Sequence, residues 1–153
     1  MKKSISSYLL IGLVFFLAIG AIWGGLSLVL DPSGVDIGFP PAMLEQLEQS
    51  PFSNFLAPGL FLFLFLGIFP MIATYGLITK RELKWAKKMN PYKNRHWSWT
   101  FSYYIGLLLI LWINMQLLFG IEFGILHFVY TLLGVLIVFV AHLSSTKKIY
   151  SIP

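Results

Sequence analysis

The sequence predicts an all-α fold: a polytopic membrane protein whose four transmembrane helices form a single bundle. Three observations support this prediction. The first two concern composition: 58% of the 153 residues are hydrophobic, and only 11% are charged. A soluble domain of this size usually carries about a quarter charged residues. The third observation is that the apolar residues form four runs of roughly 20 residues, the length that spans a bilayer core. The whole chain, residues 1–153, is therefore predicted to be one membrane domain.

The first predicted span covers about residues 5–30. Its apolar part is far longer than the hydrophobic region of a signal peptide, so we expect it to be retained as a helix after the short basic start at residues 1–4. Gly12, Gly20 and Gly24 occur in it at spacings of eight and four, and we expect them on one helical face. Such a stripe allows close approach to another helix, either inside the bundle or across a homodimer.

The longest polar segment, residues 31–54, holds four of the six acidic residues and none of the eleven basic ones. It begins with Asp31-Pro32-Ser33-Gly34, which has the residues of a type I turn. Residues 41–49 are expected to form a short amphipathic helix that lies on the membrane interface or caps the bundle. The segment is therefore predicted to be a folded, partly helical extracytoplasmic loop.

After residue 54 the chain continues to alternate apolar spans with polar connections. Pro70 lies inside the second span and predicts a kink, because proline removes a backbone hydrogen bond. The remaining elements are the second span at about residues 55–79, a basic loop at 80–97, the third span at about 98–119, the fourth span at about 125–143 and a tail at 144–153.

The distribution of charge predicts the orientation in the membrane. All eleven basic residues lie in the N-terminal start, the 80–97 loop and the tail, whereas five of the six acidic residues lie in the 31–54 loop and the 120–124 turn. Since positive loops stay in the cytoplasm, both termini are predicted to be cytoplasmic in a protein of the cell membrane. The 80–97 loop is expected to attract anionic lipid headgroups. It lacks a Gly-rich phosphate loop, and nucleic-acid binding is not expected.

Polar side chains within the spans are the candidate binding residues, because such groups are costly in lipid. Gln116 and His127 are each expected about one turn below the outer surface, facing each other with Glu122 above them. Asn114 is a further candidate, although it lies about 200° around the helix from Gln116. Asp31 is expected on the same side of the membrane. These groups form either the polar wall of an outward-facing pocket, with His127 as its titratable member, or interhelical hydrogen bonds.

Other sequence features argue against several classes of chemistry. The absence of cysteine excludes disulfides, thiolate catalysis and Cys-ligated metals. Neither HExxH nor GxSxG occurs, and no two histidines have metal-ligand spacing on one helix. We therefore predict no metal, no cofactor and no enzymatic activity.

Two non-enzymatic functions fit these features. The first is an accessory or binding subunit that engages a lipid, an apolar ligand or a membrane-protein partner. The alternative is a small transporter or permease subunit that works as a homo-oligomer. No Asp, Glu, Lys or Arg lies within any span, which argues against coupled ion transport.

The chain contains a set of short motifs, namely Asp31-Pro-Ser-Gly34, Gly38-x-Pro40, Ser50-Pro-Phe52, Pro58-Gly-Leu60, Trp112-Ile113, Gln116, Gly120 and Leu126-His127-x-x-Tyr130. Together they resemble the motifs of a family of small four-helix bacterial integral membrane proteins. The chain is more distantly similar to DoxX-like four-helix proteins. The motifs consist of turn and packing residues, so the resemblance implies a fold and carries over no catalytic residue.

Overall fold

The computed structural model describes residues 3–39, 45, 47 and 50–152. Within these ranges the chain is helical and forms no β-strand. Four helices are long and apolar enough to cross a membrane, namely Ile5–Leu30, Leu56–Thr79, Trp97–Leu118 and Ile125–His142. The predicted all-α, four-helix architecture is confirmed, and the chain is a multi-pass membrane protein.

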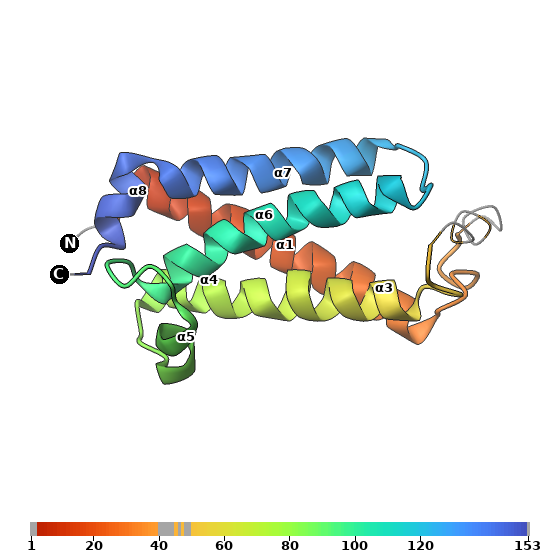
Figure 1. Cartoon of the computed structure of the whole chain (residues 1–153), viewed down its shortest axis with the longest axis horizontal. Helices are drawn as coiled ribbons and strands as arrows, with labels where there is room; N and C mark the ends of the chain where they lie inside the picture. Colours follow the sequence, from red (N-terminus) through yellow and green to blue (C-terminus); the bar gives the residue numbers. More distant parts are fainter. Residues whose placement is uncertain (1–2, 40–44, 46, 48–49, 153) are drawn as a thin grey trace.

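The helices follow one another in the order that Figure 1 shows. They are α1 (Ile5–Leu30), α3 (Leu56–Phe61), the π-helix η2 (Leu62–Ile68), α4 (Phe69–Thr79), α5 (Lys84–Met89), α6 (Trp97–Leu118), α7 (Ile125–His142) and α8 (Ser144–Ile149). α3, η2 and α4 together make the second membrane-length helix. Most of the helix predicted for residues 41–49 lies outside the described residues.

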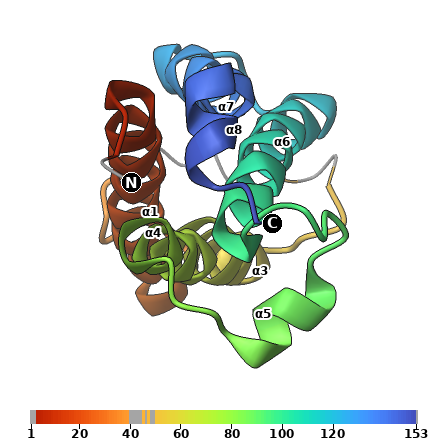
Figure 2. The same ribbon diagram turned by 90° about the vertical axis from the view of Figure 1, so that its left-hand side faces the viewer.

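The two ends of the bundle differ. Both termini lie at one end, beside α5 and α8, which we call the terminal end (Figure 1). The opposite end, called the distal end, carries the connections from α1 to α3 and from α6 to α7. Viewed from the terminal end, the long helices surround a common centre and α5 projects away from them (Figure 2).

Pro70 is accommodated by a change of helix type. The seven residues of η2 form a π-helix, and the Phe69 N–H donates to the Leu64 carbonyl five residues back. Pro70 follows directly, near the start of α4. Because proline has no N–H, an α-helical register would leave the carbonyl four residues before it without a donor. A π-helical segment next to proline shifts the hydrogen-bond register where that bond is missing.

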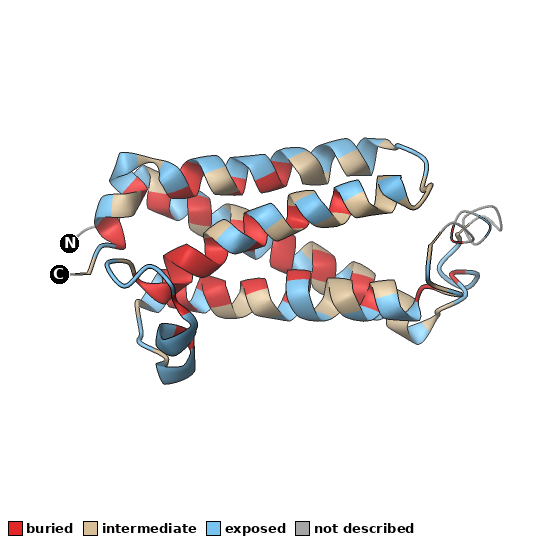
Figure 3. Ribbon diagram, in the orientation of Figure 1, coloured by how far each residue is buried: buried red, intermediate tan, exposed pale blue. Residues whose placement is uncertain are grey.

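Buried residues are concentrated in the half of the bundle nearest the terminal end (Figure 3). Three large aromatic side chains lie there, and each donates a hydrogen bond to a backbone carbonyl. Trp97 bonds to Arg81, Trp99 to Ala141 and Tyr150 to Leu77. These carbonyls lie at or just beyond helix C-termini, where the helix itself supplies no donor. The aromatic cluster therefore both fills the core and satisfies helix ends.

Three basic side chains at the terminal end also donate to helix C-termini. Lys3 bonds to the Ile78 carbonyl at 2.9 Å, Lys80 to Ile149 at 2.8 Å and Arg95 to Lys147 at 2.7 Å. A cation is stabilised there by the negative end of the helix dipole. Three cations of this end therefore form hydrogen bonds within the protein, whereas the lysines of α5 remain exposed.

Glycines allow close contacts between α1 and the second membrane-length helix, which consists of α3, η2 and α4. A Cβ atom on Gly25 would lie 2.5 Å from the Phe63 backbone nitrogen, and one on Gly67 would lie 2.8 Å from the Ile22 side chain. Such distances leave no room for a side chain, so only glycine permits this approach. The glycines that bring these helices together are therefore outside the predicted stripe of Gly12, Gly20 and Gly24.

Candidate ligand-binding cavity

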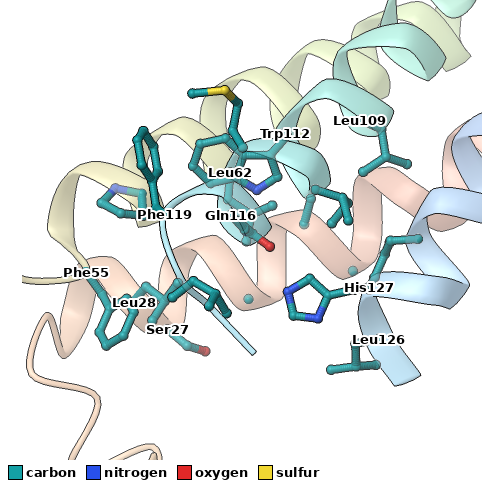
Figure 4. Close-up of a pocket in the computed structure, with 18 of the residues that line it drawn as sticks. Ser27, Leu28, Phe55, Leu62, Leu109, Trp112, Gln116, Phe119, Leu126 and His127 are labelled. Atoms are coloured by element: carbon teal, nitrogen blue, oxygen red, sulfur yellow. The ribbon is translucent and has the colours of Figure 1, made fainter. Parts of the chain in front are cut away.

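A cavity of about 470 Å³ lies between the helices in the distal half of the bundle. Residues of α1, α3, η2, α6 and α7 line it, and the two distal connections contribute further side chains (Figure 4). α6 contacts the second membrane-length helix mainly through α4 in the terminal half, rather than through α3 or η2. The space between the helices at the distal end is therefore left unfilled by helix packing.

The lining is predominantly apolar, and no charged residue contributes to it within the described part of the chain. Aromatic side chains are prominent, and Trp112 of α6 stacks on Phe61 of α3 with ring centroids 4.3 Å apart. This stack bridges the two helices beside the cavity. The hydroxyl, amide and imidazole groups in the lining are Ser27, Ser50, Gln116, His127 and Tyr130.

His127 lies in the first turn of α7, and its ring is fixed by the local backbone. The Gly124 N–H donates to the His127 Nδ1 at 3.1 Å. Gly124 is the N-cap of α7, so its N–H lies outside the helical hydrogen-bond ladder and is free to make this contact. The ring projects into the space between α7 and α1 (Figure 4).

Gln116 reaches the same cavity from the last turns of α6 (Figure 4). Its backbone carbonyl accepts a hydrogen bond from the Ile121 N–H at 3.1 Å, which closes the connection to α7. Gly120 has a φ of +82° in this turn, a conformation that favours glycine. The turn thus holds the distal end of α6, and with it Gln116, beside the start of α7.

The structure does not bring the other predicted site residues to the cavity. The Asn114 amide donates to the Ile110 carbonyl of its own helix at 2.8 Å and is exposed, as its angular separation from Gln116 implies. Glu122 is exposed in the α6–α7 connection. Asp31 and Glu122 are both absent from the lining. Of the five predicted polar residues, the cavity therefore includes Gln116 and His127.

Asp31 instead organises the start of the distal loop. Its carboxylate accepts hydrogen bonds from the backbone N–H groups of Ser33, Asp36 and Ile37, and from the Ser33 hydroxyl. The Ser33 hydroxyl bond contributes most to lowering the pKa of Asp31, and the backbone donors add to it. The folded loop places Ile37 and Phe39 in the cavity lining. Asp31 therefore supports one wall of the cavity without lining it.

The predicted glycine stripe divides between two environments. Gly20 and Gly24 line the cavity, where a Cβ would lie 3.0 Å from the Tyr130 hydroxyl and 3.5 Å from Leu62, respectively. Gly12 faces open space and has no neighbour within 4 Å of a Cβ. The two cavity glycines thus leave volume free between helices, whereas Gly12 makes no close helix contact within the single chain.

The cavity extends to the lipid-facing surface between α1 and α7. Trp23 of α1 and Leu126 of α7 both line it, yet they are 78% and 65% exposed. Residues that are both lining and exposed mark the rim of a cavity. Its rim therefore includes the seam between these two helices.

The aromatic residues of the connection from α1 to α3 were not among the predicted site residues. Phe39, Phe52 and Phe55 all line the cavity. Phe39 also packs edge-to-face on Phe55 at 5.5 Å. The available signal was three phenylalanines within a segment otherwise rich in polar and turn residues, because apolar rings in a loop need a surface to cover.

No protein-family model, curated protein or solved structure matches this chain. Within residues 3–39, 45, 47 and 50–152, no three His, Cys, Asp or Glu side chains gather closely enough to hold a metal ion. What the cavity can bind follows from the chemistry of its lining.

Proposed function

We propose that this protein is a non-enzymatic membrane protein that binds a neutral, lipid-like ligand in the distal cavity. The uncharged and largely apolar lining is the observation that carries this proposal. The cavity volume of about 470 Å³ falls in the range of about 300–1,000 Å³ that is typical of small-molecule sites. A charged ligand would lose its hydration without gaining an opposite charge from the described lining, and this cost favours neutral ligands.

The charge distribution supports an orientation for the cavity. Both termini and the basic α5 region lie at the terminal end. The positive-inside rule favours a cytoplasmic position for this end. The distal cavity then lies in the extracytoplasmic half of the cell membrane. The exposed Lys84, Lys87 and Lys88 of α5 would contact anionic lipid headgroups on the opposite side.

The rim between α1 and α7 suggests how a ligand reaches the cavity. Trp23 and Leu126 face the hydrocarbon region and border the cavity. A lipid-like ligand dissolved in the bilayer can enter between them without crossing water. This route agrees with a lining that is predominantly apolar.

Binding is favoured over transport because buried side chains fill the bundle between the cavity and the terminal end. Leu10 and Val14 of α1, and Ile137 of α7, are completely buried in the terminal half. A transporter needs access to its site from both sides of the membrane. A cavity confined to the distal half suits a subunit that holds its ligand or presents it to a membrane partner.

Filling the cavity tests the proposal. Gly24→Leu places a side chain in the cavity, whereas Gly12→Leu places the same side chain in open space. We expect native mass spectrometry to detect a lipid-like adduct on the wild type and Gly12→Leu, and about tenfold less of it on Gly24→Leu. Equal adduct on both variants, with both folded as judged by size-exclusion chromatography, would contradict a ligand in this cavity.

A further inference from the structure

We propose that the ligand carries an oxygen acceptor at one end, and that the His127 Nε2–H donates to it. This inference rests on the proposed function and specifies which neutral ligands the cavity selects. It depends on the hydrogen bond between Gly124 and His127 and on the position of the imidazole in the lining.

The Gly124 N–H determines which ring nitrogen of His127 carries the proton. Because Nδ1 accepts the hydrogen bond from Gly124, it must present a lone pair. In the neutral imidazole the proton is then on Nε2. Nε2 has no protein partner within the described part of the chain, so its N–H is available to a ligand in the cavity.

The hydroxyl and amide groups of the lining discriminate less between ligands, whereas the indole N–H groups of Trp23 and Trp112 are donors only, like His127 Nε2–H. The Ser27 hydroxyl donates to the Trp23 carbonyl at 2.9 Å, and the Ser50 hydroxyl donates to the Leu47 carbonyl at 2.8 Å. Their protons are therefore used within the protein. The Gln116 amide and the Tyr130 hydroxyl can each donate or accept, and they suit either kind of ligand group.

His127 is thus the one lining imidazole, fixed as a donor, within the described residues. A pure hydrocarbon would leave its N–H unpaired in an apolar cavity, which costs binding free energy. A ketone, ester, ether or alcohol at the end of a hydrocarbon chain supplies the missing acceptor. The ligand class is therefore a neutral amphiphile with an oxygen-containing head.

Two probes of matched length test this inference, namely the methyl ketone dodecanone and the alkane dodecane. Saturable binding of each radiolabelled probe is measured by scintillation proximity on the full-length protein in nanodiscs, with protein-free nanodiscs as background. We expect the wild type to bind dodecanone about tenfold more tightly than dodecane, once partitioning into lipid is subtracted.

Two variants separate the donor from the ring's structural role. His127→Asn keeps an acceptor near Nδ1 for Gly124 but does not reach the position of Nε2, and it should lose the ketone preference. His127→Gln places an amide N–H near the position of Nε2, and it should keep most of that preference.

The outcomes distinguish the two proposals. Equal saturable binding of both probes by the wild type, or an unchanged ketone preference in His127→Asn, overturns the role of His127 and leaves the cavity as an apolar site. Saturable binding of neither probe overturns the proposed function, and the role of His127 with it.

Discussion

The hydroxyl of Tyr150 donates a hydrogen bond of 2.9 Å to the backbone carbonyl of Leu77, and both residues are buried. They are separated by 73 positions in the sequence. Leu77 lies in the last turn of α4, where its carbonyl has no helical donor. Burial raises the pKa of Tyr150, so the phenol remains a hydrogen-bond donor. Tyr150, which follows α8, thus supplies a hydrogen-bond donor to the C-terminus of α4.

Tyr150→Phe should destabilise the fold, because it leaves the Leu77 carbonyl buried without a donor. We expect a loss of about 1–3 kcal/mol, and thus a fall of several degrees in the melting temperature measured in detergent. Tyr8→Phe is the matched control, because Tyr8 is 61% exposed. The same melting temperature for both variants would argue against a stabilising role for this hydrogen bond.

Adjacent glycines of α1 should respond differently to alanine. Gly25→Ala forces a Cβ to within 2.5 Å of the Phe63 backbone nitrogen, and we expect a loss of about 1–3 kcal/mol. Gly24→Ala places its Cβ at an ordinary contact distance from Leu62, and we expect no loss, since alanine favours helix by up to about 1 kcal/mol. Thermal unfolding of the two variants measures the difference. Similar stabilities would mean that α1 and η2 pack less closely than the structure shows.

His96 should make stability depend on pH. Its Nδ1 contacts the Ser98 hydroxyl at 2.8 Å, and its Nε2 lies 3.5 Å from the Glu82 carboxylate. Burial lowers the pKa of His96 below its usual 6.5, and the nearby Glu82 charge opposes this effect without reversing it. The unfolded state therefore takes up the proton first as the pH falls, and stability present above about pH 6.5 is lost below it.

The pH effect can be measured by thermal unfolding between about pH 7.5 and about pH 5.5. The wild type should lose more stability over this interval than His96→Asn, which keeps a capping acceptor for α6 but does not titrate. Glu82→Gln should steepen the wild-type loss, because it removes the charge that stabilises the protonated ring. Parallel pH profiles for the wild type and His96→Asn would rule out His96 as the source.

The orientation can be tested with single cysteines, because the natural chain has none. Ser33 lies in the distal loop and Asn94 follows α5 at the terminal end, and both are exposed. We expect a membrane-impermeant maleimide added to intact cells to label Ser33→Cys but not Asn94→Cys. Permeabilised cells should show labelling of both, which serves as the control. Labelling of both positions in intact cells would refute the four-span topology.

Hydropathy and polarity were enough to predict the spans and two residues of the cavity. Gln116 and His127 could be identified because a polar side chain in a hydrophobic run is costly unless it faces the interior. Asn114 is also a polar side chain in a hydrophobic run, but it donates a hydrogen bond to the Ile110 carbonyl of its own helix. An amide that satisfies itself in this way can face outward, and polarity alone does not distinguish the two cases.

The glycine pattern shows why packing could not be predicted in the same way. Gly24 and Gly25 are adjacent, yet one borders the cavity and the other touches the backbone of η2. In a soluble helix, an apolar stripe would have indicated the inward face. Lipid is as apolar as the protein interior, so the hydrophobic residues of a membrane helix carry no such signal.

The sequence by itself determined the fold class, because spanning hydrocarbon requires about 20 consecutive apolar residues and this is a local property of the chain. It also separated the acidic from the basic connections. Only the tertiary structure decided that the helices leave a cavity at the distal end. It also decided that Asp31 holds the loop that forms one cavity wall, and that Tyr150 donates a hydrogen bond to the C-terminus of α4. Those features depend on the rotation and separation of helices, which arise from contacts between residues far apart in the chain.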